Sequence, residues 1–215
     1  MQPDNSEQGN KPEASPWRSD DQYILGVALE DADAFYARVH SFSVREPMRT
    51  VQSYFTVEHL QRVMSPSMPQ LANDINAFMA LSPFGPDSEL VVDQTRVGKA
   101  MVDLLAKSLR RRPTRVELPD GGTEGMITSY TYGIPIKFFI SNLKARVHAG
   151  EVRVAPAVWD AADLETALVG MNADDLNPMV IAVGLAVWRA EKTKGRFGPP
   201  PRVIRSYAKH KGYER

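Results

Sequence analysis

Asp93, Asp174 and Asp175 are the carboxylates whose positions could support chemistry. Asp93 ends an apolar run that predicts a strand over 89–93, and a helix is expected over 97–109 directly after it. Ligands of α/β proteins bind at the carboxyl edge of such strands. Asp174 and Asp175 open a second predicted helix, over 174–192. If the two acidic features converge, they could bind a pair of hard divalent cations, Mg²⁺ or Mn²⁺, of the kind that hydrolyses phosphodiesters.

Both acidic features also have ordinary structural explanations. An aspartate between a strand and a helix can simply cap the helix. Adjacent carboxylates at a helix N-terminus are favoured by the helix dipole. A site for two ions usually needs three or four carboxylates, so neither feature is sufficient alone.

The order of the predicted elements indicates which fold would bring these residues together. Strands are expected over 23–28, 34–44 and 50–57, and then strands and helices alternate. A segment rich in Gly, Thr, Ser and Tyr, 119–133, is expected to be a long loop or a hairpin. The remaining elements are helices over 67–81, 137–148 and 161–169 and strands over 115–118 and 151–154. This order predicts an α/β fold whose mixed sheet has an antiparallel three-strand meander at one edge and parallel strands at the other, flanked by helices, in a ribonuclease-H-like layout.

The charge is distributed unevenly along the 215 residues. The chain has 26 basic and 26 acidic residues, which sum to zero. Residues 1–21 carry −3, residues 189–215 carry +7, and the residues between them carry −4. We therefore expect a disordered N-terminal segment (1–21), a single ribonuclease-H-like domain (22–194) and a basic C-terminal tail (195–215).

The absence of cysteine limits the chemistry that is available. No disulfide, thiolate nucleophile or cysteine-ligated metal can form, so any metal must be a hard ion bound by oxygen. The N-terminus has no signal-peptide pattern, and no apolar run reaches the length of a membrane span. These features favour a cytoplasmic protein that has no membrane partner.

Basic residues near Asp93 and in the tail are candidates for binding DNA. Arg96 and Lys99 flank the turn after Asp93 and could contact phosphates, although a solvated helix start explains them as well. Cations of the tail alternate with Phe197, Tyr207 and Tyr213, which suits phosphate contact with some stacking, although a tail that only aids solubility would look similar. The candidate tail cations are Arg196, Arg202, Arg205, Lys209 and Lys211.

The segment 89–105, ELVVDQTRVGKAMVDLL, resembles the nuclease domain of phage large terminase subunits. The similarity continues in the family's own order over most of the chain, from Tyr23 to Glu191. Its further pieces are 56–62, 134–137, 150–156, 174–176 and 182–188. No single piece is specific to the family. The resemblance depends on all the pieces occurring together in the same order as in the family.

The resemblance implies a ribonuclease-H fold that cuts double-stranded DNA with two Mg²⁺ or Mn²⁺ ions during genome processing and packaging. Asp93 matches the acidic residue of the central strand, and Asp175, with Asp174 as auxiliary ligand or general base, matches the acidic pair that opens the last helix. It also implies a phage or prophage protein in the cytoplasm of a bacterial host. A separate terminase ATPase chain or a portal would be its partner, because this chain has no phosphate-binding loop of an ATPase.

Three positions depart from the family pattern. Ala28 stands where the family has its first-strand Asp, Arg96 where it has Gly, and Ala173 where it has His. Glu30 and Asp31 are the nearest substitute ligands, but the backbone of Glu30 should lie about 6 to 7 Å from that of Ala28. Two hypotheses follow: a metal-dependent endonuclease, or a catalytically inactive module that binds DNA or a packaging partner.

Overall fold

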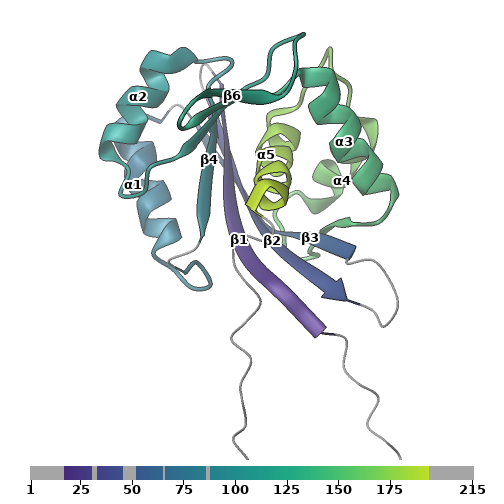
Figure 1. Ribbon diagram of the computed structural model, residues 1–215. Coiled ribbons are helices and arrows are strands. Elements are labelled where there is room, and N and C mark those ends of the chain that lie inside the picture. Colours follow the sequence, from purple (N-terminus) through teal and green to yellow (C-terminus); the bar gives the residue numbers. More distant parts are fainter. Residues whose placement is uncertain (1–16, 31–32, 46–51, 65, 86–87, 194–215) are drawn as a thin grey trace, which may run out of the picture.

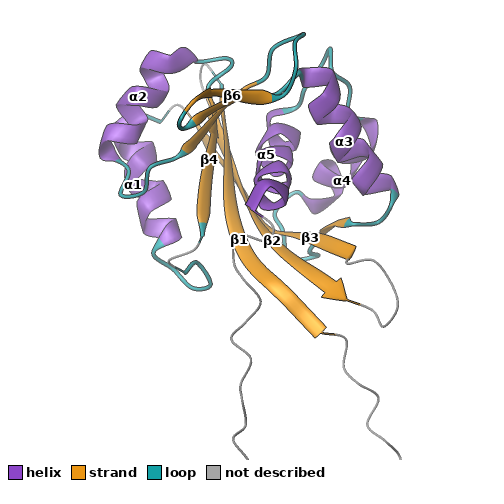
Figure 2. Cartoon of the chain, in the orientation of Figure 1, coloured by secondary structure: helices purple, strands orange, loops and turns teal. Residues whose placement is uncertain are grey.

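The computed structural model describes residues 17–30, 33–45, 52–64, 66–85 and 88–193. They form an eight-stranded mixed sheet with helices on both faces (Figures 1 and 2). The strands are β1 (Trp17–Leu29), β2 (Asp33–Arg45), β3 (Gln52–Met64), β4 (Glu89–Asp93), β5 (Thr114–Glu117), β6 (Gly125–Thr128), β7 (Thr131–Gly133) and β8 (Val152–Val154). The helices are α1 (Met68–Met79), α2 (Gly98–Ser108), α3 (Ile136–His148), α4 (Ala161–Gly170) and α5 (Pro178–Thr193).

The strands are arranged in the order β6-β7-β5-β4-β1-β2-β3-β8. β1, β2 and β3 form an antiparallel meander, and β4, β5 and β7 continue the sheet from β1 in parallel. The predicted mixed α/β sheet is thus confirmed. Two details are wrong: the meander is not at an edge, because β8 pairs in parallel with β3 outside it, and the strand at the other edge, β6, is antiparallel to β7.

Two hydrophobic cores lie on opposite faces of the sheet, and β1 contributes to both. Leu25, Val27 and Leu29 face α1 and α2, whereas Ile24 and Ala28 face α3, α4 and α5. Successive side chains of a strand point to opposite faces, so this separation follows directly from the pleat. Figure 1 shows α1 and α2 on one side of the sheet and the other helices across from them.

Two predicted boundaries differ from the observed ones for identifiable reasons. β1 begins at Trp17, before the expected domain start at residue 22, because pairing with β2 extends back to Trp17. The last helix begins at Pro178, not at Asp174. A residue before proline is driven out of helical conformation, and here the side chain of Asn177 accepts a hydrogen bond from the Met179 backbone at 2.9 Å. Asp174 and Asp175 therefore precede the helix.

None of the helices in the described part of the chain combines the length and the apolar character that crossing a membrane requires.

α5 approaches the centre of the sheet unusually closely at Gly26. A Cβ atom at Gly26 would lie 2.0 Å from the Ala182 carbonyl oxygen and 3.1 Å from the Ala186 nitrogen. Both contacts are with helix backbone, which cannot move aside as a side chain can. All residues of α5 from Val180 to Ala190 are buried. Only glycine at position 26 allows this helix to pack directly on β1.

We predict that Gly26→Ala destabilises the fold, because the added methyl group collides with the backbone of α5. The expected loss is about 3 kcal/mol or more, which lowers the melting temperature by roughly 6 to 12 °C in a domain of this size. Gly170→Ala is the matched control, since a Cβ there has no neighbour within 4 Å. Thermal unfolding of both variants checks this, and equal melting temperatures would contradict the close approach.

Candidate functional site

Asp93 lies at the end of β4 with its side chain turned into the fold and is 1% exposed. Its Oδ1 accepts hydrogen bonds from the Thr95 backbone at 2.9 Å and the Thr95 hydroxyl at 2.5 Å. The Thr95 hydroxyl in turn accepts from the Leu118 backbone nitrogen at 2.8 Å. Asp93 does not cap α2, because that helix begins at Gly98 and has no side-chain cap. The capping alternative for Asp93 is therefore wrong.

The second carboxylate oxygen of Asp93 is buried without a partner among the described residues. Burial raises the pKa of Asp93, since an apolar environment disfavours the charged form. The hydrogen bonds from Thr95 and the charge of Arg96 oppose this rise in pKa, and the negative charge of Glu30 adds to it. The carboxylate is therefore held in an unfavourable environment, at a cost in stability.

Ala28 lies beside Asp93 on the same face of the sheet. β1 and β4 are parallel, with Val27 paired to Val92, so the next residues in this register are Ala28 and Asp93. Ala28 is completely buried in the core under α5. The position that the family resemblance assigns to a first-strand aspartate is thus adjacent to Asp93, and here it carries a methyl group.

Arg96 connects three segments around this position. Its guanidinium forms an ion pair with Glu30 at the end of β1. It also donates a hydrogen bond to the Leu176 carbonyl oxygen at 2.9 Å, in the loop between α4 and α5. The same positive charge acts on Asp93. A permanent cation therefore lies among Glu30, Asp93 and the segment that carries Asp175.

A groove with a volume of about 780 Å³ opens beside Arg96 and is mainly acidic. Glu30 and Asp175 line it, as expected for residues of one site. Asp33 of β2 also lines it and forms an ion pair with Arg62 at 2.5 Å. Sequence reasoning did not identify the other polar residues of the groove, because they come from β3, the start of α4 and the loop before α5 and share no motif. These are Arg62, Trp159, Asp160, Asp163 and Asn177.

The candidate metal ligands do not assemble into one cluster. Among the described residues, no three Asp, Glu or His side chains are grouped closely enough to hold an ion. Asp174 is exposed beside Asp175 and does not line the groove, and Asp31 lies outside the described residues. Because Ala28 offers no oxygen and Arg96 contributes a positive charge, the residues present do not fit a site for two divalent cations.

The candidate DNA-binding residues are separated by the fold. Arg96 is engaged with Glu30 and Leu176, as described above. Lys99 is exposed on α2 and lines a different groove, next to Arg112 and Arg115. The tail candidates Arg196, Arg202, Arg205, Lys209 and Lys211 lie outside the described residues.

Comparison with known proteins does not assign the chain to a family. No protein-family model matches it, and no curated protein matches it. The functional assignment therefore depends on the geometry described above and on the sequence resemblance.

We predict that Asp93→Asn stabilises the protein at neutral pH. The pKa of Asp93 is raised in the folded state, so its ionisation destabilises the fold as the pH rises from the unfolded pKa, near 4, through the folded pKa. Asparagine keeps the acceptor for Thr95 and removes the charge. Its melting temperature should match the parent's at low pH and exceed it at pH 7, by roughly 2 to 4 °C for each 1 kcal/mol.

Melting curves of Asp93→Asn and the parent between pH 4 and pH 8 test this. Asp174→Asn is the control because Asp174 is exposed, and its curve should follow that of the parent. If the difference in melting temperature between Asp93→Asn and the parent does not grow with pH, the prediction that ionised Asp93 destabilises the fold is wrong.

Proposed function

We propose that this protein is a ribonuclease-H-like module, related to the nuclease domain of phage large terminases, that binds DNA without cutting it. The sheet supports the relationship, because an antiparallel meander followed by parallel strands is the layout that the resemblance implies. Asp93 at the carboxyl end of β4 and Gly26 on β1 also support it, because the resemblance assigns an acidic residue and a glycine to these strands. The loss of cutting is inferred from the site itself.

The position of the Arg96 guanidinium is the observation that carries the proposal. Arginine remains charged at any pH at which the protein is folded. A divalent cation placed between Glu30, Asp93 and Asp175 would meet this charge at close range, where the repulsion is only partly screened. The ion pair of Arg96 with Glu30 also occupies the nearest substitute for the missing first-strand carboxylate. The arginine thus neutralises the acidic residues that a metal would otherwise neutralise.

The distribution of charge supports DNA as the partner. Residues 98–117 contain six basic and two acidic residues, a net charge of +4, in a domain whose remaining residues from 22 to 188 sum to −8. The tail adds a second positive region. Neutralisation of phosphates by such regions supplies most of the affinity of non-specific DNA binding. The acidic groove would instead repel a DNA backbone. The protein would therefore bind DNA with its basic surface toward the phosphates and its acidic groove away from them.

A second candidate function, the metal-dependent endonuclease, is favoured by one observation. The buried Oδ2 of Asp93 lacks a partner among the described residues, and a metal ion would provide one. In this alternative Arg96 would leave the site when DNA binds. Asp93 and Asp175 would then be ligands of Mg²⁺ or Mn²⁺, with Asp174 auxiliary and Glu30 or Asp31 replacing the first-strand carboxylate.

We predict that the pure protein binds DNA equally well with Mn²⁺ or with EDTA and does not nick supercoiled plasmid. Gel shift and agarose nicking assays measure the two properties. Replacing the five tail cations by glutamine should lower the slope of log affinity against log salt by roughly 0.9 for each lost contact with duplex phosphate. Nicking that needs Mn²⁺ and disappears in Asp93→Ala would instead establish the endonuclease.

We further predict that the double variant Ala28→Asp, Arg96→Gly gains a Mn²⁺ site, because it adds a carboxylate beside Asp93 and removes the cation. Ala28→Asn, Arg96→Gly is the matched control, with the same size and no added charge. Saturating Mn²⁺ should raise the melting temperature of the first variant only, since an ion at 100 times its Kd contributes about 2.7 kcal/mol. An equal rise in the parent protein would show that Arg96 does not exclude the ion.

A further inference from the structure

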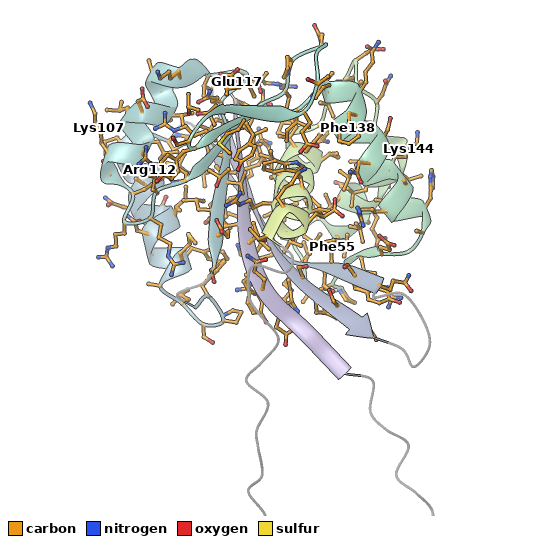
Figure 3. The ribbon with its side chains drawn as sticks, in the orientation of Figure 1. Phe55, Lys107, Arg112, Glu117, Phe138 and Lys144 are labelled. Carbon is orange, nitrogen blue, oxygen red and sulfur yellow. The ribbon has the colours of Figure 1, made fainter. Side chains whose placement is uncertain are left out.

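A second groove, separate from the acidic one, lies between the start of α2, β5 and the β6–β7 hairpin. Its volume is about 430 Å³, within the range of small-molecule pockets. Lys99, Arg112 and Arg115 supply its cations, Asp103 and Glu117 its carboxylates, and Tyr130 an aromatic ring, so the cations outnumber the carboxylates by one. Figure 3 labels Arg112 on the α2 side of the molecule and Lys144 on α3, across the sheet from it.

Two of the three cations are available for an anion. Arg115 is paired with Asp103. Lys99 and Arg112 are exposed and have no carboxylate partner among the described residues. They belong to the +4 segment 98–117, so the local field attracts a polyanion.

The aromatic ring of the groove is already stacked on one of these cations. The Arg112 guanidinium lies 3.4 Å from the centre of the Tyr130 ring, and Tyr130 remains 43% exposed. A guanidinium plane and an aromatic ring are both surfaces on which an unpaired nucleobase stacks. Their contact holds both planes in place before a ligand arrives, which lowers the entropy cost of binding.

The base of the groove adds a polar group that has an unused acceptor. Gln94 is 4% exposed, and its Nε2 donates to Glu117 Oε1 at 2.6 Å. Its own oxygen is buried with no partner among the described residues. A buried acceptor without a donor costs free energy, so this side of the groove is held in an unfavourable arrangement.

We infer that this groove holds a single nucleic-acid strand, with phosphates against Lys99 and Arg112 and an unpaired base stacked on the Arg112–Tyr130 pair. The inference rests on the proposed DNA binding and names the form of DNA that is bound. A paired base in a duplex has both faces covered by its neighbours, so it cannot stack on Tyr130. A duplex bound through its phosphates alone would make no stacking contact with the Tyr130 ring.

The test measures fluorescence anisotropy of a labelled oligothymidylate strand, and of a duplex of the same length, with the full chain. Tyr130→Ala should weaken binding of the single strand between about five-fold and a hundred-fold. Tyr130→Phe, which keeps the ring, should bind like the parent. Lys99→Gln should lower the salt slope for the single strand by about 0.7. Lys144→Gln is the charge-matched control across the sheet and should change neither affinity nor slope.

The outcomes separate this inference from the proposed function. If the parent binds the single strand and Tyr130→Ala and Lys99→Gln bind it equally well, DNA is held elsewhere, and the inference fails while the proposed function stands. Tighter binding of duplex with no effect of Tyr130→Ala also overturns the inference. If the parent binds neither form of DNA, the proposed function fails. Melting curves confirm that each variant is folded, which is expected because the altered side chains lie at the surface.

Discussion

The close contact between α5 and β1 at Gly26 sets the geometry of the candidate site. The helix backbone at Ala182 and Ala186 lies where a Cβ atom of residue 26 would be, so the middle of α5 is held against β1. That contact fixes the loop before α5, which carries Asp175 and Leu176, relative to the end of β1, which carries Glu30. Arg96 can reach both segments only because they are held close together. A bulkier residue at position 26 would separate them.

Arg96 gives the acidic residues a permanent internal counterion. In a site for divalent ions, carboxylates repel one another until metal binds, and this repulsion drives ion uptake. Here the guanidinium satisfies Glu30 and a backbone carbonyl without any ion. Asp93 still lowers the stability of the fold, because one of its carboxylate oxygens is buried and has no partner among the described residues. Burial, with the nearby negative charge of Glu30, raises the pKa of Asp93.

The net charge of zero conceals two surfaces of opposite character. The acidic groove gathers residues from β1, β2, β3, α4 and the loop before α5, whereas the basic groove is built from α2, β5 and the hairpin. The acidic groove suits a cation and the basic groove suits a phosphate chain. Their separation is the reason why the proposed DNA binding is assigned to one surface and not to the other.

The sequence by itself determined the class of fold and most of its elements. An apolar run and looser alternation predicted the three long strands but not their full lengths, and the apolar run before Asp93 predicted β4 with its correct bounds. The pattern placed Gly26 and Ala28 on one strand and Asp93 on another, and the pairing of these two strands came from the structure. The start of α5 was mispredicted, although the restriction that Pro178 imposes on Asn177 was visible in the sequence.

Only the tertiary structure decided what surrounds Asp93. Glu30, Arg96 and Leu176 are far apart in the chain, and their contacts depend on the register of β1 against β4 and on the packing of α5. The pairing of β8 with β3 and the stacking of Arg112 on Tyr130 likewise join distant segments. Sequence patterns report local periodicity, whereas the electrostatic environment of a buried carboxylate is the sum of charges that folding brings together from the whole chain.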